Sequence, residues 1–326
     1  MKKIVVTRAL PGDVLALLAH LGEVAVSAHD QAMTPTELCA AVAGADAVIT
    51  TLNDRVGPEV LAAAGPQLRL VANVAVGYDN LDVAAILAHG AVATNTPGVL
   101  VAATADLAIA LLLDVTRRVS EGDRLIRSGV PWSWDLSFLL GTGLQRRRLG
   151  IVGMGAIGQA VATRAVAFGM EVVHCSPRGP GVVGPSTRIG LPELLATSDV
   201  VTLHCPLTPE THHLISEQTL RHMKSTAYLI NTARGPVVDE AALYRALCRG
   251  DIAGAALDVY EDEPRVHPGL VELDNVVLAP HLGSATIETR TRMAALAVEN
   301  VAAVLSGRMP ITPIPWRDPS TNLFDR

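Results

Sequence analysis

Apolar residues in the first hundred positions fall into short runs separated by polar turns. Runs rich in Val, Ile and Ala indicate strands, and between them the apolar spacing is that of helices. The expected strands are Lys3–Thr7, Val24–Ser27, Ala47–Thr51, Leu68–Asn73 and Ala91–Thr94. The expected helices are Asp13–His20, Pro35–Ala43, Pro58–Ala64 and Leu81–Ala88, with Thr34 and Asn80 as N-caps. This alternation predicts a parallel, doubly wound sheet with right-handed crossovers.

The pattern changes after Asn95–Gly98, where a long apolar helix is expected from Ala102 to about Leu125. A second alternating set then begins, with strands expected at 149–153, 171–175, 199–204, 226–231, 253–258 and 275–279. Six strands suffice for a complete dinucleotide-binding fold, so that fold does not need the last helix, Ile287–Leu305. We therefore expect this helix to return to the first domain.

The predicted fold class is α/β, with two doubly wound parallel-sheet (Rossmann-like) domains. The substrate-binding domain is flavodoxin-like and discontinuous, and it comprises residues 1–98 and 286–326. Residues 99–285 form the dinucleotide-binding Rossmann domain. The two crossings between the domains, near Pro97–Gly98 and Ser284–Ala285, are the expected hinges.

Composition narrows the class of protein. The chain has 326 residues, of which 49% are hydrophobic and 3% aromatic, so the core is built from aliphatic side chains. A net charge of −6 gives no electrostatic reason to expect nucleic acid. The apolar helix around Leu107–Leu113 lies between Asp106 and Asp114 and is too short to span a bilayer. The four cysteines are scattered without metal-ligand or disulfide spacing. We expect a cytoplasmic protein that binds no metal, membrane or nucleic acid.

A glycine motif provides the first functional signal. Gly153-x-Gly155-x-x-Gly158 follows the apolar strand from Leu149 and precedes a small-residue helix, Gln159–Phe168. In a dinucleotide site the first glycine permits a tight turn, the second lets the backbone approach a pyrophosphate, and the third lets helix and strand pack closely. The helix N-terminus then offers N–H groups to the phosphates. The alternative is a glycine-rich turn in an ordinary βαβ unit.

The end of the next strand distinguishes NAD from NADP. An acidic residue there would hold a ribose 2′-hydroxyl. This chain has Ser176, Pro177 and Arg178 instead. Hydroxyl and guanidinium groups suit a 2′-phosphate, which a carboxylate would repel. We therefore predict that NADP(H) is preferred and that NAD(H) is possible, unless Arg178 is a solvated turn residue.

Three ionisable residues follow late strands, at the sheet edge where open α/β folds bind ligands. Arg234 can grip a carboxylate with its planar fork, and His281 can transfer a proton near neutral pH. Glu263 would hold the other ring nitrogen of the histidine. Together they predict a site that reduces a carbonyl next to a carboxylate. The alternatives are a salt bridge for Arg234, a structural role for His281, and a solvated acidic loop for Glu263, because Glu261 and Asp262 are adjacent.

Nearly the whole chain resembles the D-isomer-specific 2-hydroxyacid dehydrogenases, and it is most similar to their glyoxylate/hydroxypyruvate reductase branch. The segments that carry the resemblance are Val71–Asp82, Asn95–Gly98, Thr104–Ala108, Asn231–Gly235, Asp258–Pro264 and Ala279–Ser284. The resemblance implies that Arg234, Glu263 and His281 are the catalytic set. It implies substrate contacts from Leu52, Val76, Gly77 and Arg234. Beside the glycines, the cofactor contacts expected are Thr104, Met154, Ala156, Ile157, Ser176, Pro177, Arg178, Cys205, Pro206, Thr232, Ala233, Asp258 and Gly283.

The resemblance also implies a homodimer. In similar reductases a tryptophan at the place of Trp134 reaches into the partner's active site, whereas packing at the interface or in the core is the alternative. We expect NADPH-dependent reduction of the small 2-oxo acids glyoxylate and hydroxypyruvate, with His281 as general acid. A reductase of bulkier 2-oxo acids, such as 2-ketogluconate or phenylpyruvate, is the alternative within the class. A non-catalytic, nucleotide-sensing binding protein is the alternative outside it.

Overall fold

A computed structural model describes residues 1–27, 31–177 and 182–315. The chain divides into two compact units. Unit 1 is formed by Met1–Leu100 together with Thr286–Arg326, and unit 2 by Val101–Ala285. Over the described ranges, no helix combines the length and the apolar character that a membrane crossing needs.

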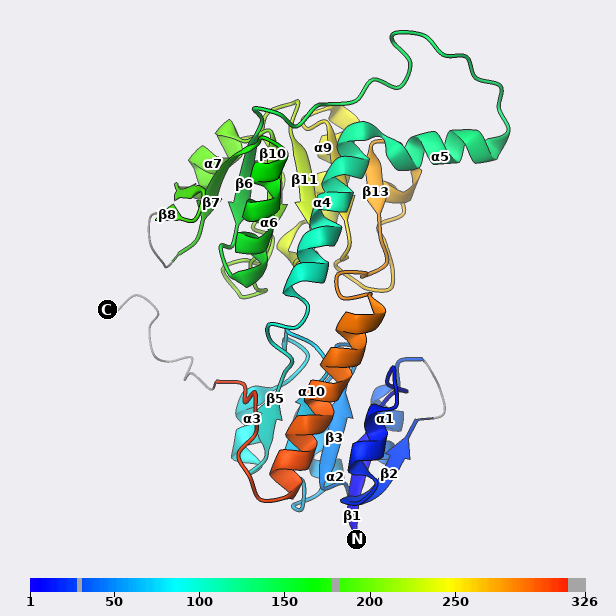
Figure 1. The fold of residues 1–326 in the computed structure, drawn as a ribbon, viewed down its shortest axis with the longest axis vertical. Helices are drawn as coiled ribbons and strands as arrows, with labels where there is room; N and C mark the ends of the chain where they lie inside the picture. The colour runs from blue at the N-terminus through cyan, green and yellow to red at the C-terminus, as the bar shows by residue number, and fades with distance from the viewer. Residues whose placement is uncertain (28–30, 178–181, 316–326) are drawn as a thin grey trace. The chain divides into compact units, whose positions relative to one another are not determined.

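Unit 1 contains a five-stranded parallel sheet in the order β2-β1-β3-β4-β5 (Figure 1). This is the strand order of flavodoxin-like doubly wound folds. Its strands are β1 (Lys2–Val6), β2 (Gly22–Val26), β3 (Ala47–Thr50), β4 (Leu70–Asn73) and β5 (Val92–Thr94). Its helices are the 3-10 helix η1 (Val14–Leu18), α1 (Pro35–Val42), α2 (Pro58–Ala64), α3 (Val83–Ala88) and α10 (Ile287–Leu305).

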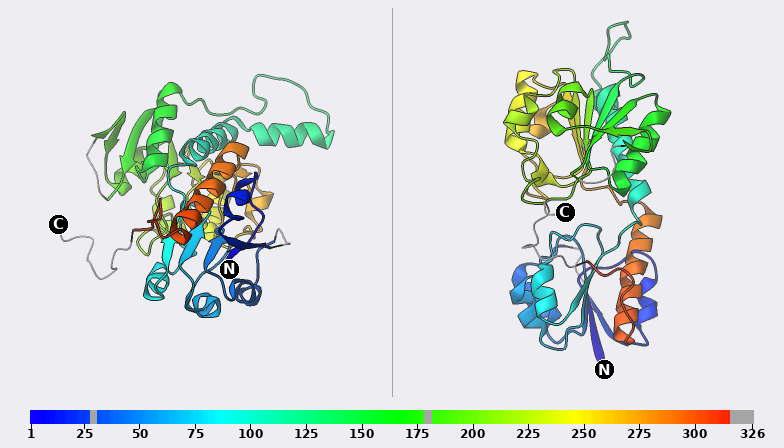
Figure 2. Two further views of the ribbon diagram at one scale, coloured as in Figure 1. Left: turned by 60° about the horizontal axis from the view of Figure 1, so that its bottom comes forward. Right: turned by 90° about the vertical axis from the view of Figure 1, so that its left-hand side faces the viewer.

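Helices cover both faces of this sheet, as the edge-on view in Figure 2 shows. One face packs on α1, α2 and α3, and the other packs on η1 and α10. Alternate residues of β1 serve the two cores: Ile4 and Val6 contact α10 and η1, whereas Val5 faces α1 and α2. The strands are therefore apolar on both sides, as buried parallel strands are.

One of the two expected N-caps in unit 1 is correct. Thr34 caps α1 in a capping box with Glu37. The prediction for Asn80 is wrong, because Asp82 caps α3 by accepting the Ala85 N–H at 2.9 Å. Asn80 instead donates to the carbonyl oxygen of Asp54 at 2.9 Å, so its side chain joins two loops.

Unit 2 contains an eight-stranded sheet in the order β13-β12-β11-β10-β6-β7-β9-β8, which is parallel except for β8. Two short edge strands were not expected from the sequence. The strands are β6 (Arg148–Val152), β7 (Glu171–Cys175), β8 (Val182–Val183), β9 (Ser186–Arg188), β10 (Val200–Leu203), β11 (Tyr228–Asn231), β12 (Gly254–Leu257) and β13 (Val276–Leu278). The helices are α4 (Val101–Arg117), α5 (Val119–Ser128), α6 (Ala156–Ala167), α7 (Leu191–Thr197), α8 (Glu217–Leu220), η2 (Gly235–Val237), α9 (Glu240–Arg249) and η3 (Leu270–Glu272).

The two faces of this sheet are also covered. Helices α4 and α6 pack on one face, and α7, α8 and α9 pack on the other. Strand order reverses at β6, which lies between β10 and β7. The expected fold class, two doubly wound parallel-sheet domains, is confirmed.

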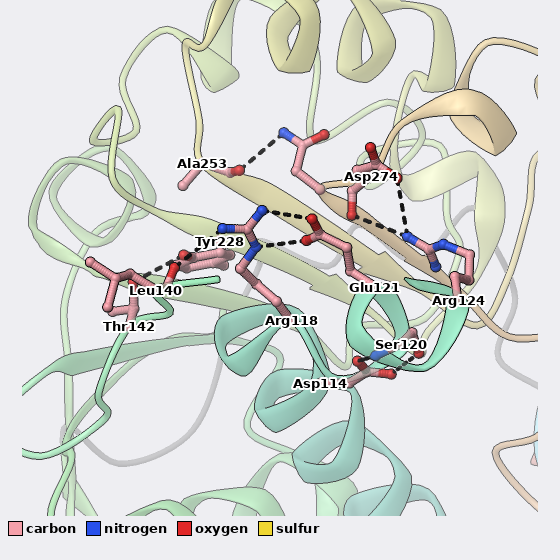
Figure 3. Close-up of polar contacts among 11 residues, drawn as sticks. Asp114, Arg118, Ser120, Glu121, Arg124, Leu140, Thr142, Tyr228, Ala253 and Asp274 are labelled. Atoms are coloured by element: carbon pink, nitrogen blue, oxygen red, sulfur yellow. Dashed lines mark hydrogen bonds and ion pairs between the residues drawn. The ribbon is translucent and has the colours of Figure 1, made fainter. Parts of the chain in front are cut away.

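The long helix expected from Ala102 to Leu125 is broken at Arg118, which has φ +56°. Two polar contacts stabilise the break (Figure 3). The Arg118 guanidinium binds both carboxylate oxygens of Glu121 at 2.6 Å, and Asp114 accepts the Ser120 N–H at 2.7 Å. Helix α5 therefore starts in a new direction and projects from the body of unit 2, as Figure 1 shows.

Candidate active site

The glycine motif lies where β6 ends and α6 begins. Gly153 has φ +98°, and a Cβ there would lie 2.6 Å from backbone atoms of His204 and Cys205. A Cβ on Gly158 would lie 2.3 Å from the carbonyl oxygen of Gly153. A Cβ on Gly155 would meet nothing within 4 Å. The loop therefore has a tight turn, an open approach and a close helix–strand contact, which are the three features of a pyrophosphate-binding turn.

Helix α6 starts without a side-chain cap. Gly155 is its N-cap residue, and Ala156 and Ile157 are the first helical residues. Their N–H groups and the positive end of the helix dipole face the open side of the glycine loop. The Met154 carbonyl oxygen accepts a bond from Gln159 Nε2 at 3.2 Å, which fixes the turn. This end of α6 fits a phosphate group.

The end of β7 bears no acidic residue. Cys175 closes the strand, and Ser176 and Pro177 follow it. Arg178 lies outside the described residues. Burial raises the pKa of the Cys175 thiol, and it raises that of Cys205, after β10, to about 11. Both thiols are therefore neutral and small, and neither brings a negative charge to this edge of the sheet.

Arg234, Asp258 and His281 follow β11, β12 and β13, which are neighbours in the sheet. Parallel strands end at the same edge, so the three residues share the edge that also bears the glycine loop. Glu263 lies in the loop after β12, between Tyr260 and η3.

The side chains of His281 and Glu263 are in contact at this edge of the sheet. Nδ1 of His281 lies 2.7 Å from Oε2 of Glu263, and both side chains are about a quarter exposed, at 27% and 26%. The other Glu263 oxygen accepts the Tyr260 N–H at 3.1 Å. Burial acts to raise the pKa of Glu263, but the bond to His281, the Tyr260 N–H and the charge of Arg234 outweigh it and lower the pKa. Glu263 is therefore held as a carboxylate.

The backbone of His281 adopts the left-handed region, with φ +54°, which a non-glycine residue rarely does. Asp258 stabilises this turn. Its carbonyl oxygen accepts the His281 N–H at 2.9 Å, and its carboxylate accepts the N–H groups of Leu282 at 2.6 Å and Gly283 at 2.8 Å. The hydroxyl of Thr104 donates to the Gly283 carbonyl oxygen at 2.9 Å. Asp258 is 1% exposed, so its carboxylate is shielded from water and is hydrogen-bonded to the backbone next to His281.

The loop of Arg234 is fixed by its neighbours. Asn231 accepts the Ala233 N–H at 3.0 Å and donates to the Arg234 carbonyl oxygen at 3.0 Å. A Cβ on Gly235 would lie 1.8 Å from the backbone of Tyr260. Only glycine therefore lets the Arg234 loop lie directly on the loop that leads to Glu263.

His204 is placed for structure rather than proton transfer. Its ring lies 3.0 Å from the Thr202 hydroxyl and 3.4 Å from that of Thr232. Burial lowers its pKa to about 4, so the ring is neutral. Pro206, two residues on, is exposed. The described parts of the chain contain no group of three or more His, Cys, Asp or Glu side chains that could hold a metal ion.

The expected substrate loop belongs to unit 1. The carbonyl oxygens of Val76 and Gly77 accept bonds from Asn95 at 2.8 Å and Asn73 at 3.1 Å. Within the described residues, the N–H groups of Val76 and Gly77 have no hydrogen-bond partner. Leu52 is 37% exposed in a neighbouring turn. The loop therefore has two backbone N–H donors, and the carbonyl oxygens of the same two residues accept hydrogen bonds from within unit 1.

Trp134 lies in the segment that follows α5, and it is 74% exposed. Trp132 stacks on Phe138 with ring centroids 5.7 Å apart, whereas no ring contact is seen for Trp134 in the described structure. The alternative that Trp134 packs in the core of its own chain is therefore wrong.

Unit 2 thus brings together the glycine loop, Asp258, Glu263 and His281. Sequence reasoning missed Asn231, Tyr260 and Glu240, which hold the loops of these residues in place. Glu240 starts α9 and accepts the Glu261 N–H at 2.7 Å. The signal for it, an acidic pair at a helix start, is too common in surface helices to reveal a partner in a distant loop.

Comparisons with known proteins agree on the family. Residues 109–283 match the model of the D-isomer specific 2-hydroxyacid dehydrogenase, NAD binding domain. The glyoxylate reductase of Thermococcus litoralis is 44% identical over 317 residues, covering 94% of this chain and 95% of that protein. The crystal structure of the TT0316 protein from Thermus thermophilus has 47% identity and a TM-score of 0.90, covering 96% of this chain and 100% of that one.

A third relative is the crystal structure of an NADPH-dependent glyoxylate/hydroxypyruvate reductase from Sinorhizobium meliloti in complex with NADP and malonate. It is 32% identical, with a TM-score of 0.82 and 96% of each chain covered. Domain model, full-length relatives and solved structures thus lead to one assignment. This chain belongs to the D-isomer-specific 2-hydroxyacid dehydrogenase family, in its glyoxylate reductase branch, and is an NAD(P)-dependent enzyme that reduces 2-oxo acids.

Proposed function

We propose that the enzyme reduces glyoxylate and hydroxypyruvate to 2-hydroxy acids with NADPH. The observation that carries this proposal is the 2.7 Å contact between His281 Nδ1 and Glu263 Oε2, on the sheet edge that also bears the glycine loop. The names of the relatives from Thermococcus litoralis and Sinorhizobium meliloti support the substrate class.

His281 is the proton donor in this proposal. An ionised carboxylate can only accept hydrogen bonds, so the contact with Glu263 requires a proton on Nδ1. The second ring nitrogen, Nε2, is then the one that exchanges a proton with the substrate oxygen. Among the described residues no hydrogen bond occupies Nε2. A positioned general acid of this kind contributes about 10²–10⁴ in rate.

The substrate carboxylate has two kinds of donor in this proposal. Arg234 provides a planar fork that binds the carboxylate and polarises the neighbouring carbonyl. Val76 and Gly77 provide backbone N–H groups, which supports a substrate-binding role for residues 1–98 and 286–326. Leu52, beside them, would limit the size of the side chain that the substrate carries.

The residues of 99–285 fit a nicotinamide dinucleotide, which supplies the hydride when bound. Gly153, Gly155 and the N-terminus of α6 would hold the pyrophosphate. The remaining contacts proposed are Thr104, Met154, Ala156, Ile157, Gly158, Ser176, Pro177, Arg178, Cys205, Pro206, Thr232, Ala233, Asp258 and Gly283. Thr104 and Asp258 would act partly through the backbone at Gly283, to which both are bonded.

The preference for NADPH rests on the end of β7. Because no carboxylate follows Cys175, nothing there repels a 2′-phosphate, and Ser176 offers a hydroxyl. Measuring kcat/KM with NADPH and with NADH tests this preference. A higher value with NADH would refute it, and Ser176→Asp should move the ratio toward NADH.

The decisive assay follows the absorbance of NADPH with a panel of 2-oxo acids. The proposal expects the highest kcat/KM with glyoxylate or hydroxypyruvate. Higher values with 2-ketogluconate or phenylpyruvate would favour the reductase of bulkier acids. NADPH binding without turnover of any acid would favour a nucleotide-sensing protein.

We also propose a homodimer in which the segment from Val119 to Leu140 contacts the partner. Helix α5 has no buried residue, and several large apolar side chains near it are exposed: Val119, Ile126, Val130, Trp132, Trp134, Leu136 and Leu140. Apolar surface gathered in this way is typical of an interface. Light scattering tests the dimer.

If Trp134→Ala leaves the preference between glyoxylate and hydroxypyruvate unchanged, the specificity role of Trp134 is wrong.

A cytoplasmic location remains part of the proposal. All four cysteines are free thiols, as is usual in a reducing compartment. Fractionation of the native host with an antibody against the enzyme tests this location.

A further inference from the structure

The catalytic candidate Glu263 lies in a short loop, residues 261–267, between β12 and η3. A loop carboxylate keeps a 2.7 Å contact with a histidine that follows another strand only if the loop itself is fixed. The fixing contacts come from α9, which is distant in sequence and packs on the same face as α8.

The carboxylate of Glu240, the first residue of α9, closes this loop. Its Oε1 accepts the Glu261 N–H at 2.7 Å, and its Oε2 accepts the His267 N–H at 3.1 Å. These two N–H groups belong to the first and last residues of the loop. Glu240 is 6% exposed, so water competes little for either bond. One buried side chain thus joins both ends of the segment that carries Glu263.

The side chain of Glu261 in turn binds the backbone of Glu240. Its Oε2 accepts the N–H of Glu240 at 2.9 Å, at the N-terminus of α9, where a negative charge is favoured by the helix dipole. Its Oε1 lies 2.6 Å from Nε2 of His213. The two glutamates therefore exchange backbone N–H bonds, and the imidazole of His213 occupies the remaining oxygen. We name His213, Glu240 and Glu261 the Glu240 clamp.

A hydrogen bond and an ion pair also join residues in the interior of the loop. Asp262 accepts the N–H of Arg265 at 2.9 Å, and their side chains form an ion pair. Tyr260, just before the loop, donates its hydroxyl to the Ala279 carbonyl oxygen at 2.9 Å, two residues before His281. Hydrogen bonds thus hold both ends of the loop and its turn, and Glu263 lies between them.

We propose that Glu240 is a positioning residue of the reaction: through the clamp it holds Glu263 against His281. This inference rests on the proposed function, in which His281 donates the proton. It differs from a general structural role because it predicts an effect on proton transfer beyond any loss of stability. Within this acidic loop, the Glu261 side chain binds Glu240 and His213, whereas Asp262 is exposed to solvent.

The variant Glu240→Gln tests the clamp with little change in volume. A glutamine amide has only one acceptor oxygen, so one of the two loop N–H groups must face an NH₂ group. We expect kcat for glyoxylate to fall by about tenfold or more, because displacements near 1 Å can cost as much as 10²-fold. KM for NADPH should stay within about twofold, because the glycine loop is untouched. The exposed Glu193 on α7 provides the matched control, Glu193→Gln.

Two further readouts separate positioning from simple destabilisation. The proton NMR signal of the His281 Nδ1–H, which reports its hydrogen bond to Glu263, should weaken in Glu240→Gln and stay unchanged in Glu193→Gln. In a Glu263→Gln background, adding Glu240→Gln should cost less than about twofold, since residues that act through one group are not additive. An equal loss in both backgrounds, or an unchanged Nδ1–H signal in Glu240→Gln, would overturn the proposal.

A milder variant is also available. His213→Asn removes the outer contact of the clamp, at a side chain that is 36% exposed, together with the stacking of the His213 ring on His212. It should weaken the His281 Nδ1–H signal by a smaller amount than Glu240→Gln does. If Glu240→Gln fails to fold, His213→Asn provides the test, and an unchanged Nδ1–H signal would refute the clamp.

The Nδ1–H signal of His281 can be measured without turnover. If wild type reduces none of the acids tested, the proposed function fails, yet the clamp still predicts a weaker Nδ1–H signal in Glu240→Gln. Equal signals in wild type and Glu240→Gln would refute the clamp whether or not the enzyme is active.

Discussion

Nδ1 of His281 lies 2.7 Å from Oε2 of Glu263, and each of the two residues is anchored by a different carboxylate. Asp258 binds the backbone on the His281 side, and Glu240 binds the backbone on the Glu263 side. The pair is therefore fixed from both sides by buried groups that belong to the Rossmann-like unit. Such preorganisation means that little rearrangement of the pair is needed before proton transfer.

Removing the Glu263 charge should change how stability depends on pH. The pKa of Glu263 is lowered in the folded chain, since the bond to His281 and its other partners outweigh burial. A lowered carboxyl pKa gives stability that is present above the unfolded value of about 4.3 and is lost as pH falls through the folded value. Urea unfolding should therefore show wild type more stable than Glu263→Gln at pH 7. The difference should shrink below about pH 4. A difference that is constant over this range would contradict the lowered pKa.

Arg234→Lys should impair binding and chemistry together. A lysine keeps the charge but loses the planar fork, so it cannot hold a carboxylate and polarise a carbonyl at once. We expect kcat/KM for glyoxylate to fall by about 10²-fold, with kcat and KM both affected. Steady-state kinetics provide the test. An unchanged kcat with only a higher KM would mean that Arg234 binds the substrate without polarising it.

Gly235→Ala should displace the Glu263 loop. The new methyl group would lie 1.8 Å from the Tyr260 backbone, so one of the two loops must move. We expect a loss of about 1–3 kcal/mol in unfolding free energy, as overpacking typically costs, together with a lower kcat. Gly143→Ala is the control, because a Cβ there meets nothing within 4 Å. Normal turnover and stability of Gly235→Ala would show that the loops are looser than the structure indicates.

His204 should remain neutral well below the pH at which an ordinary histidine is protonated. Burial lowers its pKa from 6.5 to about 4, so between these values the unfolded chain binds a proton that the folded chain does not. Stability should therefore fall as pH drops from 6.5 toward 4, and His204→Gln should show a flatter curve in this window. NMR titration gives the direct check. A midpoint near 6.5 would mean that the ring is solvated.

Much of the fold was predictable because it depends on local pattern. Continuous apolar runs such as Leu149–Val152 identify buried parallel strands, and their alternation with helices determines the doubly wound class. The break at Arg118 was not predictable, since the helical pattern continues across it and the turn depends on side-chain pairs with Glu121 and Asp114. The strands β8 and β9 are too short to show any period.

The candidate site likewise contains residues that could be predicted from the sequence and residues that could not. Gly153 and the residues at strand ends are visible because position along the chain implies position at the sheet edge. The catalytic roles of Arg234, Glu263 and His281 stay predictions. Glu240 was invisible because its partners, Glu261 and His267, lie more than twenty residues away and contribute backbone N–H groups, which no side-chain pattern encodes.

The most direct test is the turnover of His281→Asn with NADPH and glyoxylate, measured together with NADPH affinity. Asparagine tolerates the left-handed backbone at this position, so the variant removes the imidazole with little strain. If the His281 imidazole delivers the proton, kcat should fall by about 10²-fold or more while NADPH binds as in wild type. Turnover close to that of wild type would show that this imidazole does not deliver the proton.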